Sequence, residues 1–227
     1  MKPRLDMVIL KPREDLERRW ASDTIITPDS ALLGADSLTI GARRDSAAVC
    51  EIVNIGPGSE ECPDVSHAKV GDVAVLPLYG ASKVLIVKGE AFIMTRFRNL
   101  AGIVRNLGQA AETVEAINDY VLTRQDRPAF ERLLNGGLIL HDNYVADGIP
   151  CDGGTESIVR VVLERVASAG TGHWELDRAG RRVSLRSPED RPGDAVIFNP
   201  ITSVRFRRWG TWWRLVPYED IQAAIEG

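Results

Sequence analysis

The chain has 227 residues, 44% of them hydrophobic and 26% charged, with a net charge of −4 at pH 7. This composition is typical of a globular protein with one large or two small cores, and its acidic balance argues against nucleic-acid binding. No apolar run approaches the roughly 20 residues of a membrane helix and no signal-peptide pattern occurs, so we expect a cytoplasmic protein.

The first apolar run, Leu5 to Lys11, lies between Pro3 and Pro12 and predicts a short strand at the start of a barrel. Its expected counterpart in the second half of the chain is Gly137 to His141. Residues 13–46 then lose regular periodicity. Such a long stretch is uncommon in a compact domain and usually has a function or is disordered.

The next predicted strand is Ala48 to Gly56, which runs into the turn signal Gly56-Pro57-Gly58. Val161 to Ala169 repeats its pattern later in the chain. Because several segments of the first half recur in the same order in the second half, the sequence indicates an internal duplication.

The clearest repeat is Lys69 to Val104, whose plan returns in Arg191 to Glu226. A gapless alignment places Gly71-Asp72 on Gly193-Asp194 and continues to the end of both segments. Each copy predicts a strand, a hairpin with glycine at its turn, a second strand and a short closing segment. We interpret both aspartates as turn-forming residues, not catalytic ones.

A helical insert is predicted between the two copies, over residues 105–135. Apolar residues in Gly108 to Arg124 recur at steps of four, three and four, which is typical of one face of an amphipathic helix. A second short helix is expected to begin near Asp126 and to end at Asn135-Gly136-Gly137.

The ordered motifs resemble the GroES family of co-chaperonins. The matching segments are Lys2-Pro3-Arg4, Asp6, Val8-Ile9, Lys11, Glu51, Val53, Gly56, Gly58, Lys69-Val70-Gly71-Asp72 and the closing Asp220-Ile221-Gln222-Ala223-Ala224-Ile225-Glu226. The resemblance implies a mainly β protein with two tandem GroES-like small β barrels, at residues 1–104 and 136–227, joined by the short helical insert.

The family also implies a function without catalysis: capping a chaperonin chamber through a mobile loop and so assisting protein folding. The matching loop is residues 13–46, and the implied partner-binding residues are Thr24, Ile25, Ile26 and Thr27. The second copy is expected to carry only a short loop, Asn143 to Ser157. A rival interpretation is a structural ring or decoration protein, such as a phage virion component found in the host cytoplasm or the virion.

Self-association into a ring or dome is expected, because the family pairs terminal strands between subunits and open barrel edges need covering. The predicted seam residues are Met7, Val8 and Ile9 near the start of the chain and Ile221 and Ile225 near its end.

No catalytic, cofactor or metal site is predicted. The three cysteines and three histidines have no metal-ligand spacing, and an odd number of cysteines does not indicate a disulfide framework. They are Cys50, Cys62, Cys151, His67, His141 and His173.

The segment Arg205 to Arg214 interleaves basic and aromatic residues on a predicted hairpin. Cross-strand aromatic packing covered by arginine stems is the favoured interpretation. A protein interface and a nucleic-acid surface stay open as alternatives.

Overall fold

The computed structural model describes residues 2–13, 15, 47–77, 82–124, 162–198 and 203–225. Antiparallel β-strands dominate these residues, which confirms the mainly β prediction. Within the same ranges, no helix has both the length and the apolar character that a membrane span requires.

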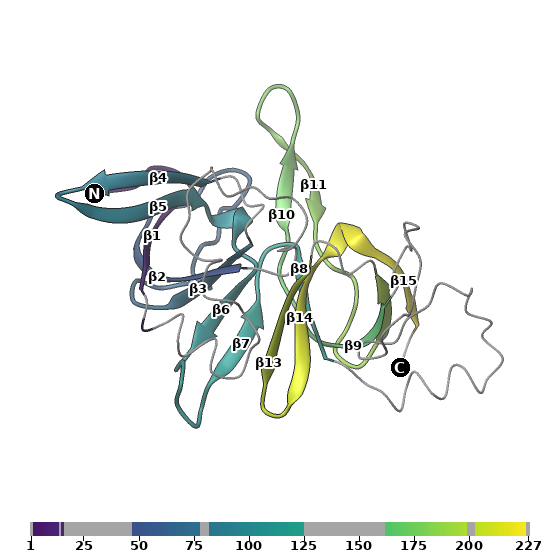
Figure 1. Ribbon diagram of the computed structural model, residues 1–227. Helices are drawn as coiled ribbons and strands as arrows, with labels where there is room; N and C mark the ends of the chain where they lie inside the picture. Colours follow the sequence, from purple (N-terminus) through teal and green to yellow (C-terminus); the bar gives the residue numbers. More distant parts are fainter. Residues whose placement is uncertain are drawn as a thin grey trace, which may run out of the picture.

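The first sheet has seven strands in the order β4-β5-β1-β2-β3-β6-β7 (Figure 1). The strands are β1 (Met7–Pro12), β2 (Ala47–Ile55), β3 (Val73–Pro77), β4 (Ser82–Val87), β5 (Glu90–Arg96), β6 (Gly102–Arg105) and β7 (Thr113–Ala116). A 3-10 helix, η3 (Phe97–Asn99), precedes β6. We call this sheet and its loops the first unit.

The second sheet has six strands in the order β13-β14-β8-β9-β12-β15. The strands are β8 (Tyr120–Arg124), β9 (Val162–Ala169), β12 (Ala195–Phe198), β13 (Val204–Arg208), β14 (Thr211–Pro217) and β15 (Ile221–Ile225). A 3-10 helix, η5 (Tyr218–Asp220), precedes β15. This sheet forms the second unit, from which a separate two-stranded arm projects, made of β10 (His173–Leu176) and β11 (Arg182–Arg186) (Figure 1).

The two sheets have the same strand order. Each of the first six strands has a counterpart that keeps the same neighbours: β1 matches β8, β2 matches β9, β3 matches β12, β4 matches β13, β5 matches β14 and β6 matches β15. Among the described residues, β7 is the one strand of the first sheet without a counterpart. Both sheets run from one edge strand to another, so no closed barrel is observed among the described strands.

The same hydrogen bonds hold matching turns in the two units. The Lys69 N–H donates to the Asp72 carboxylate at 2.8 Å, and the Arg191 N–H donates to the Asp194 carboxylate at 2.8 Å. Each aspartate therefore fixes the turn that leads into β3 or β12, in keeping with a turn-forming role.

The gapless alignment is wrong by one residue after β3 and β12. Ile93 pairs with Leu10 in the first sheet, and Arg214 pairs with Thr123 at the matching place in the second. Strand pairing therefore matches Ile93 with Arg214. The hairpin glycines Gly89 and Gly210 follow the same shifted register, and both have the positive φ that favours glycine, at 82° and 76°.

The helix predicted over Gly108 to Arg124 is also wrong, because this segment contains β7 and β8. Exposed and buried residues alternate along β7, and Asn118 takes a positive φ of 55°, which interrupts any helix there. The buried Asn118 side-chain amide donates to the carbonyl oxygens of Phe97 at 2.8 Å and Leu100 at 2.9 Å, and so fixes the corner between the sheets.

The second unit therefore starts earlier in the chain than expected. Its counterpart of β1 is β8, whereas Gly137 to His141 and the second predicted helix, near Asp126, lie outside the described residues. Residues 13–46 connect β1 to β2 and residues 125–161 connect β8 to β9. The two units thus carry long connections of similar length at the same place in the sheet.

Three groups of buried side chains form the core. One lies on the inner face of each sheet, around Val8, Leu10 and Phe97 in the first unit and around Val121 and Phe198 in the second. The third joins the outer faces of the two sheets, and we call it the junction. Its main residues are Val49, Val73, Val75, Val104 and Val114 from the first unit and Leu122, Val204, Phe206 and Leu215 from the second.

Candidate interaction surfaces

The predicted partner-binding residues Thr24, Ile25, Ile26 and Thr27 lie outside the described residues. The strands on either side of their segment are well defined: β1 and β2 pair with each other, from Val8 opposite Ile55 to Pro12 opposite Cys50. Both ends of the connection therefore leave the same end of one strand pair.

The predicted assembly seam on β1 does not fit the sheet. This strand pairs with β2 on one side and β5 on the other, and Val8 and Ile9 are buried, so neither edge of β1 can accept another strand. The seam residues Ile221 and Ile225 lie on β15, which pairs with β12 alone among the described strands. Among the described strands, β15 is therefore an edge strand, and edge strands are places where further strands can pair.

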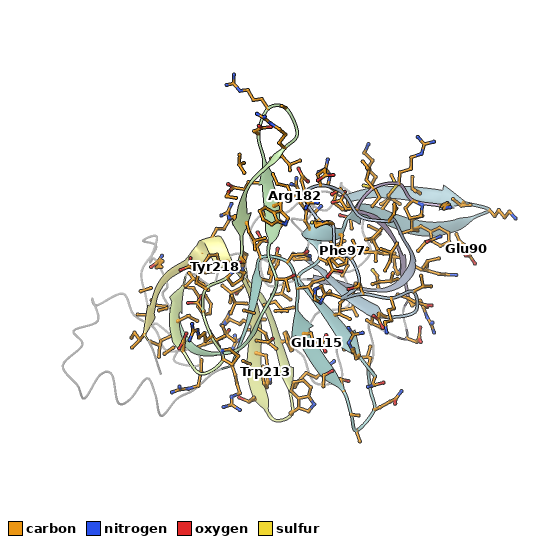
Figure 2. The ribbon with its side chains drawn as sticks, turned by 180° about the vertical axis from the view of Figure 1, so that it is seen from behind. Glu90, Phe97, Glu115, Arg182, Trp213 and Tyr218 are labelled. Atoms are coloured by element: carbon orange, nitrogen blue, oxygen red, sulfur yellow. The ribbon has the colours of Figure 1, made fainter. Side chains whose placement is uncertain are left out.

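A buried ion pair crosses the junction. The Arg208 guanidinium on β13 donates to the Glu112 carboxylate, ahead of β7, with an N–O distance of 2.9 Å and side-chain exposures of 3% and 8%. The Trp213 indole N–H donates to the Arg208 carbonyl oxygen at 3.1 Å. Figure 2 labels Trp213 on the second sheet and Glu115 on the first. The junction thus combines an apolar core with a desolvated charge pair.

Arg105 fixes the first unit's side of the junction. Its guanidinium donates to the carboxylates of Asp72 at 2.9 Å and Glu115 at 3.2 Å and to the carbonyl oxygen of His67 at 2.7 Å. Glu115, and after it Asp72, raise the pKa of Arg105. The cation ties the β6–β7 hairpin to the turn before β3.

A second buried ion pair lies inside the second sheet. Arg214 donates to the Glu164 carboxylate at 3.0 Å and to the Ser203 hydroxyl at 3.3 Å, and the Thr123 hydroxyl donates to the other Glu164 oxygen. Glu164 is 0% exposed and Arg214 is 3% exposed. Removal of a carboxylate and a guanidinium from water is costly unless each is hydrogen-bonded, as both are here.

The first unit has apolar residues at the matching positions. Strand register matches Thr123 with Leu10 and Arg214 with Ile93. Glu164 pairs with Val196 on β12, and Cys50 pairs with Ala74 on β3, so Glu164 corresponds to Cys50. The two sheets therefore hold the same three positions together by different means: apolar packing in the first and ionic hydrogen bonding in the second.

The arm of the second unit rests on a loop of the first. The Trp174 N–H donates to the Glu61 carbonyl oxygen at 2.8 Å, and Arg182 donates to the Glu60 carbonyl oxygen at 2.9 Å. The guanidinium of Arg182, a residue labelled in Figure 2, also lies 5.7 Å from the centre of the Trp174 ring. These contacts connect the units at a second place, away from the junction.

The described part of the Arg205 to Arg214 hairpin fits the packing interpretation. Phe206 is fully buried in the junction, and Trp213 packs against the same cluster. Trp209 and Trp213 meet edge to face with 5.1 Å between ring centroids. Trp209, at 48% exposure, is more exposed than Trp213, which is partly buried.

The described cysteines and histidines do not converge on a common point. Cys50 and Cys62 are both buried, and burial raises the pKa of Cys62 to about 12, so its thiol is protonated at neutral pH. Among the described residues, no three metal-ligating side chains gather, while His141 and Cys151 lie outside these ranges.

Asp190 is a carboxyl group whose surroundings disfavour its charged form. One of its oxygens is buried without a hydrogen-bond partner, and burial, followed by the charges of Asp194 and Glu189, raises its pKa above 3.8. This group therefore favours folding below its unfolded pKa, and that contribution is lost as the pH rises through the raised folded pKa. Asp190→Asn should raise the thermal midpoint at pH 7 and leave it unchanged at pH 3. Equal shifts in both buffers would contradict this account.

The sequence did not predict the two buried ion pairs, Arg208 with Glu112 and Arg214 with Glu164. The one available signal was a charged residue, Glu164, within the apolar strand Val161 to Ala169. Comparison with known protein families and with curated protein sequences gives no significant match for this chain.

Proposed function

We propose that the chain is a tandem GroES-like co-chaperonin, a non-enzymatic protein that caps a chaperonin chamber and needs no cofactor. The observation that supports the proposal is the repeated sheet, in which both units carry a long connection between matching first and second strands. In this proposal each sheet with its loops corresponds to one GroES-like domain, and each chain offers two connections to a partner.

The proposed chaperonin contact is Thr24 to Thr27 in the first connection, with Ile25 and Ile26 as apolar anchors. Ordering even ten loop residues costs about 10–20 kcal/mol of backbone entropy, whereas burial of two isoleucines returns about 3–6 kcal/mol. A single loop would therefore bind weakly. An assembly that presents several loops at once gains effective concentration, so the function requires self-association.

Substitution of both isoleucines by serine tests the proposal. Ile25→Ser with Ile26→Ser should abolish chaperonin-dependent refolding of a denatured substrate protein, since the apolar anchors of the loop are lost. Sedimentation of the variant should match that of the wild type, because these side chains would contact the chaperonin and not another copy. Unchanged refolding activity would overturn the proposed contact.

A structural ring or decoration protein, of the kind found in a phage virion, is the second candidate. The projecting arm favours it, because capping alone gives no role to the exposed apolar residues Val183 and Leu185, which are 63% and 48% exposed. In that case the loop would pack within the protein's own assembly. The same double substitution would then weaken the assembly and leave refolding unaffected.

A further inference from the structure

The hairpin of β4 and β5 forms one edge of the first sheet. Among the described strands, β4 pairs with β5 alone, and Figure 1 shows the hairpin projecting from the first unit. Val84 and Ile86 on β4 are 66% and 69% exposed, although both side chains are apolar and β-branched. An exposed apolar edge strand is a place where another strand can pair.

The turn of this hairpin determines which main-chain groups of β4 face outward. Its two central residues, Lys88 and Gly89, have positive φ values of 52° and 82°, as a type I′ turn requires. The residues on either side of such a turn form a hydrogen-bonded pair, and bonded and non-bonded pairs then alternate along the hairpin. Val84 and Ile86 fall in non-bonded pairs, so their N–H and C=O groups point away from β5.

The second unit has charged residues at the same edge positions. Strand register matches Val84 with Arg205 and Ile86 with Arg207 on β13, which is the edge strand of its own sheet. Charged side chains on an edge strand discourage the addition of further strands. The first unit instead has apolar side chains there, and this difference points to a partner for β4.

We propose that β4 binds an extended polypeptide segment of another protein, which adds to the first sheet as a further strand. The segment has apolar residues at alternate positions and an acidic residue at each end. Its main-chain groups pair with those of Val84 and Ile86, and its apolar side chains lie beside theirs, because opposite residues of an antiparallel pair project to the same face. Ile93 extends this apolar face to the core, since it packs against the inner-face cluster of the first unit.

The charges along β4 favour an acidic partner. Lys83 and Lys88 lie at the two ends of the apolar part of the edge, and both are exposed. Glu90 is the one carboxylate of β4 and β5, and it already pairs with Lys11 on β1 at 2.9 Å. Acidic residues at the ends of a bound segment would complement the lysines. A second copy of this chain, paired through its own β4, would instead bring the lysines of both copies together.

The proposed edge site goes beyond the co-chaperonin function and does not include the loop contact. It depends on β4 and β5, so the two proposals can fail separately. A wild-type protein that assists refolding without binding an extended peptide would disprove only the edge site. One that binds the peptide without assisting refolding would disprove only the loop contact.

A labelled synthetic peptide tests the strand pairing. Valine and threonine alternate in this peptide, a glutamate stands at each end, and fluorescence polarisation measures its binding to the full chain. Methylation of the valine nitrogens should abolish binding, because those N–H groups would donate to β4. Methylation of the threonine nitrogens should change the Kd by less than about 3-fold, because those groups face away from β4. Equal binding by the two methylated peptides would overturn strand addition.

Two variants of β4 test the site on the protein. Val84→Arg with Ile86→Arg gives β4 the residues of β13 and should raise the Kd about 30-fold or more, since both apolar contacts are lost. Val84→Pro should raise the Kd about 10-fold, because proline removes one outward N–H and leaves the bonds to β5 in place. The matched control is Val183→Arg, which makes the same change at a valine that is 63% exposed on the arm. It should bind the peptide like the wild type.

Three outcomes would overturn the proposal. The first is a wild-type protein that does not bind the peptide, and the second is a double variant that binds as tightly as the wild type. The third is a wild-type dimer that dissociates in the double variant, which would make a second copy the partner of β4. If a thermal melt shows that the double variant is unfolded, Val84→Thr with Ile86→Thr replaces it, because threonine keeps the β-branched shape with less apolar surface.

Discussion

Glu164→Ala should destabilise the protein by about 3–5 kcal/mol, because it leaves the Arg214 guanidinium buried without its carboxylate. Arg214 is 3% exposed, and its bond to Glu164 measures 3.0 Å. Urea unfolding followed by circular dichroism would measure the loss as a lower midpoint. A cost below about 1 kcal/mol would show that water or another group replaces the carboxylate.

The first unit provides a matched control for this pair. The triple variant Thr123→Leu, Glu164→Cys and Arg214→Ile copies the apolar residues of the first sheet into the second. Replacement of a buried ion pair by packed apolar residues is often neutral or stabilising by about 1–4 kcal/mol. The triple variant should therefore be at least as stable as the wild type, although it also lacks Glu164. A triple variant as unstable as Glu164→Ala would mean that the second sheet cannot accommodate apolar packing there.

The repeated plan of the chain could be predicted from the sequence because its signals are local. A glycine at each hairpin turn and an aspartate before β3 and β12 mark the ends of strands wherever the rest of the chain lies. Alternation of apolar residues then indicates the strands themselves. The one-residue error in alignment falls between the end of β3 and the start of β4, where no local signal fixes the register.

The helix over Gly108 to Arg124 was predicted wrongly because two short strands and a corner imitated helical periodicity. Val114 and Val121 are buried for different reasons, the first in the junction and the second inside the second sheet. Spacing along the sequence cannot separate one apolar face from two. The positive φ of Asn118 depends on its bonds to Phe97 and Leu100, which come from another part of the chain.

The junction could not be predicted for a similar reason. Glu112 and Arg208 are far apart in the sequence, and nothing around either residue distinguishes it from an exposed charge. Arg208 even stands in a run of arginines and tryptophans that is compatible with a nucleic-acid surface. Their burial follows from the packing of one unit on the other, which joins residues that are distant in the sequence.

Glu112→Ala is the second substitution from which we expect a large effect, about 3–5 kcal/mol, since it leaves Arg208 buried without its carboxylate. The loss should weaken the contact between the units, because this ion pair is buried between them at 2.9 Å. Hydrogen exchange should therefore rise first in β7 and β13, on the two sides of the junction, ahead of the inner strands β2 and β9.

Glu115→Ala is the matched control, because Glu115 lies three residues further along the same hairpin and also pairs with an arginine. Its side chain is 49% exposed, and its partner Arg105 keeps the carboxylate of Asp72 at 2.9 Å. An exposed pair of this kind contributes about 0–1 kcal/mol, so the control should unfold close to the wild-type midpoint. If Glu112→Ala and Glu115→Ala unfold at the same midpoint, the ion pair does not hold the units together. The apolar residues around Phe206 and Leu215 would then account for the stability of the junction.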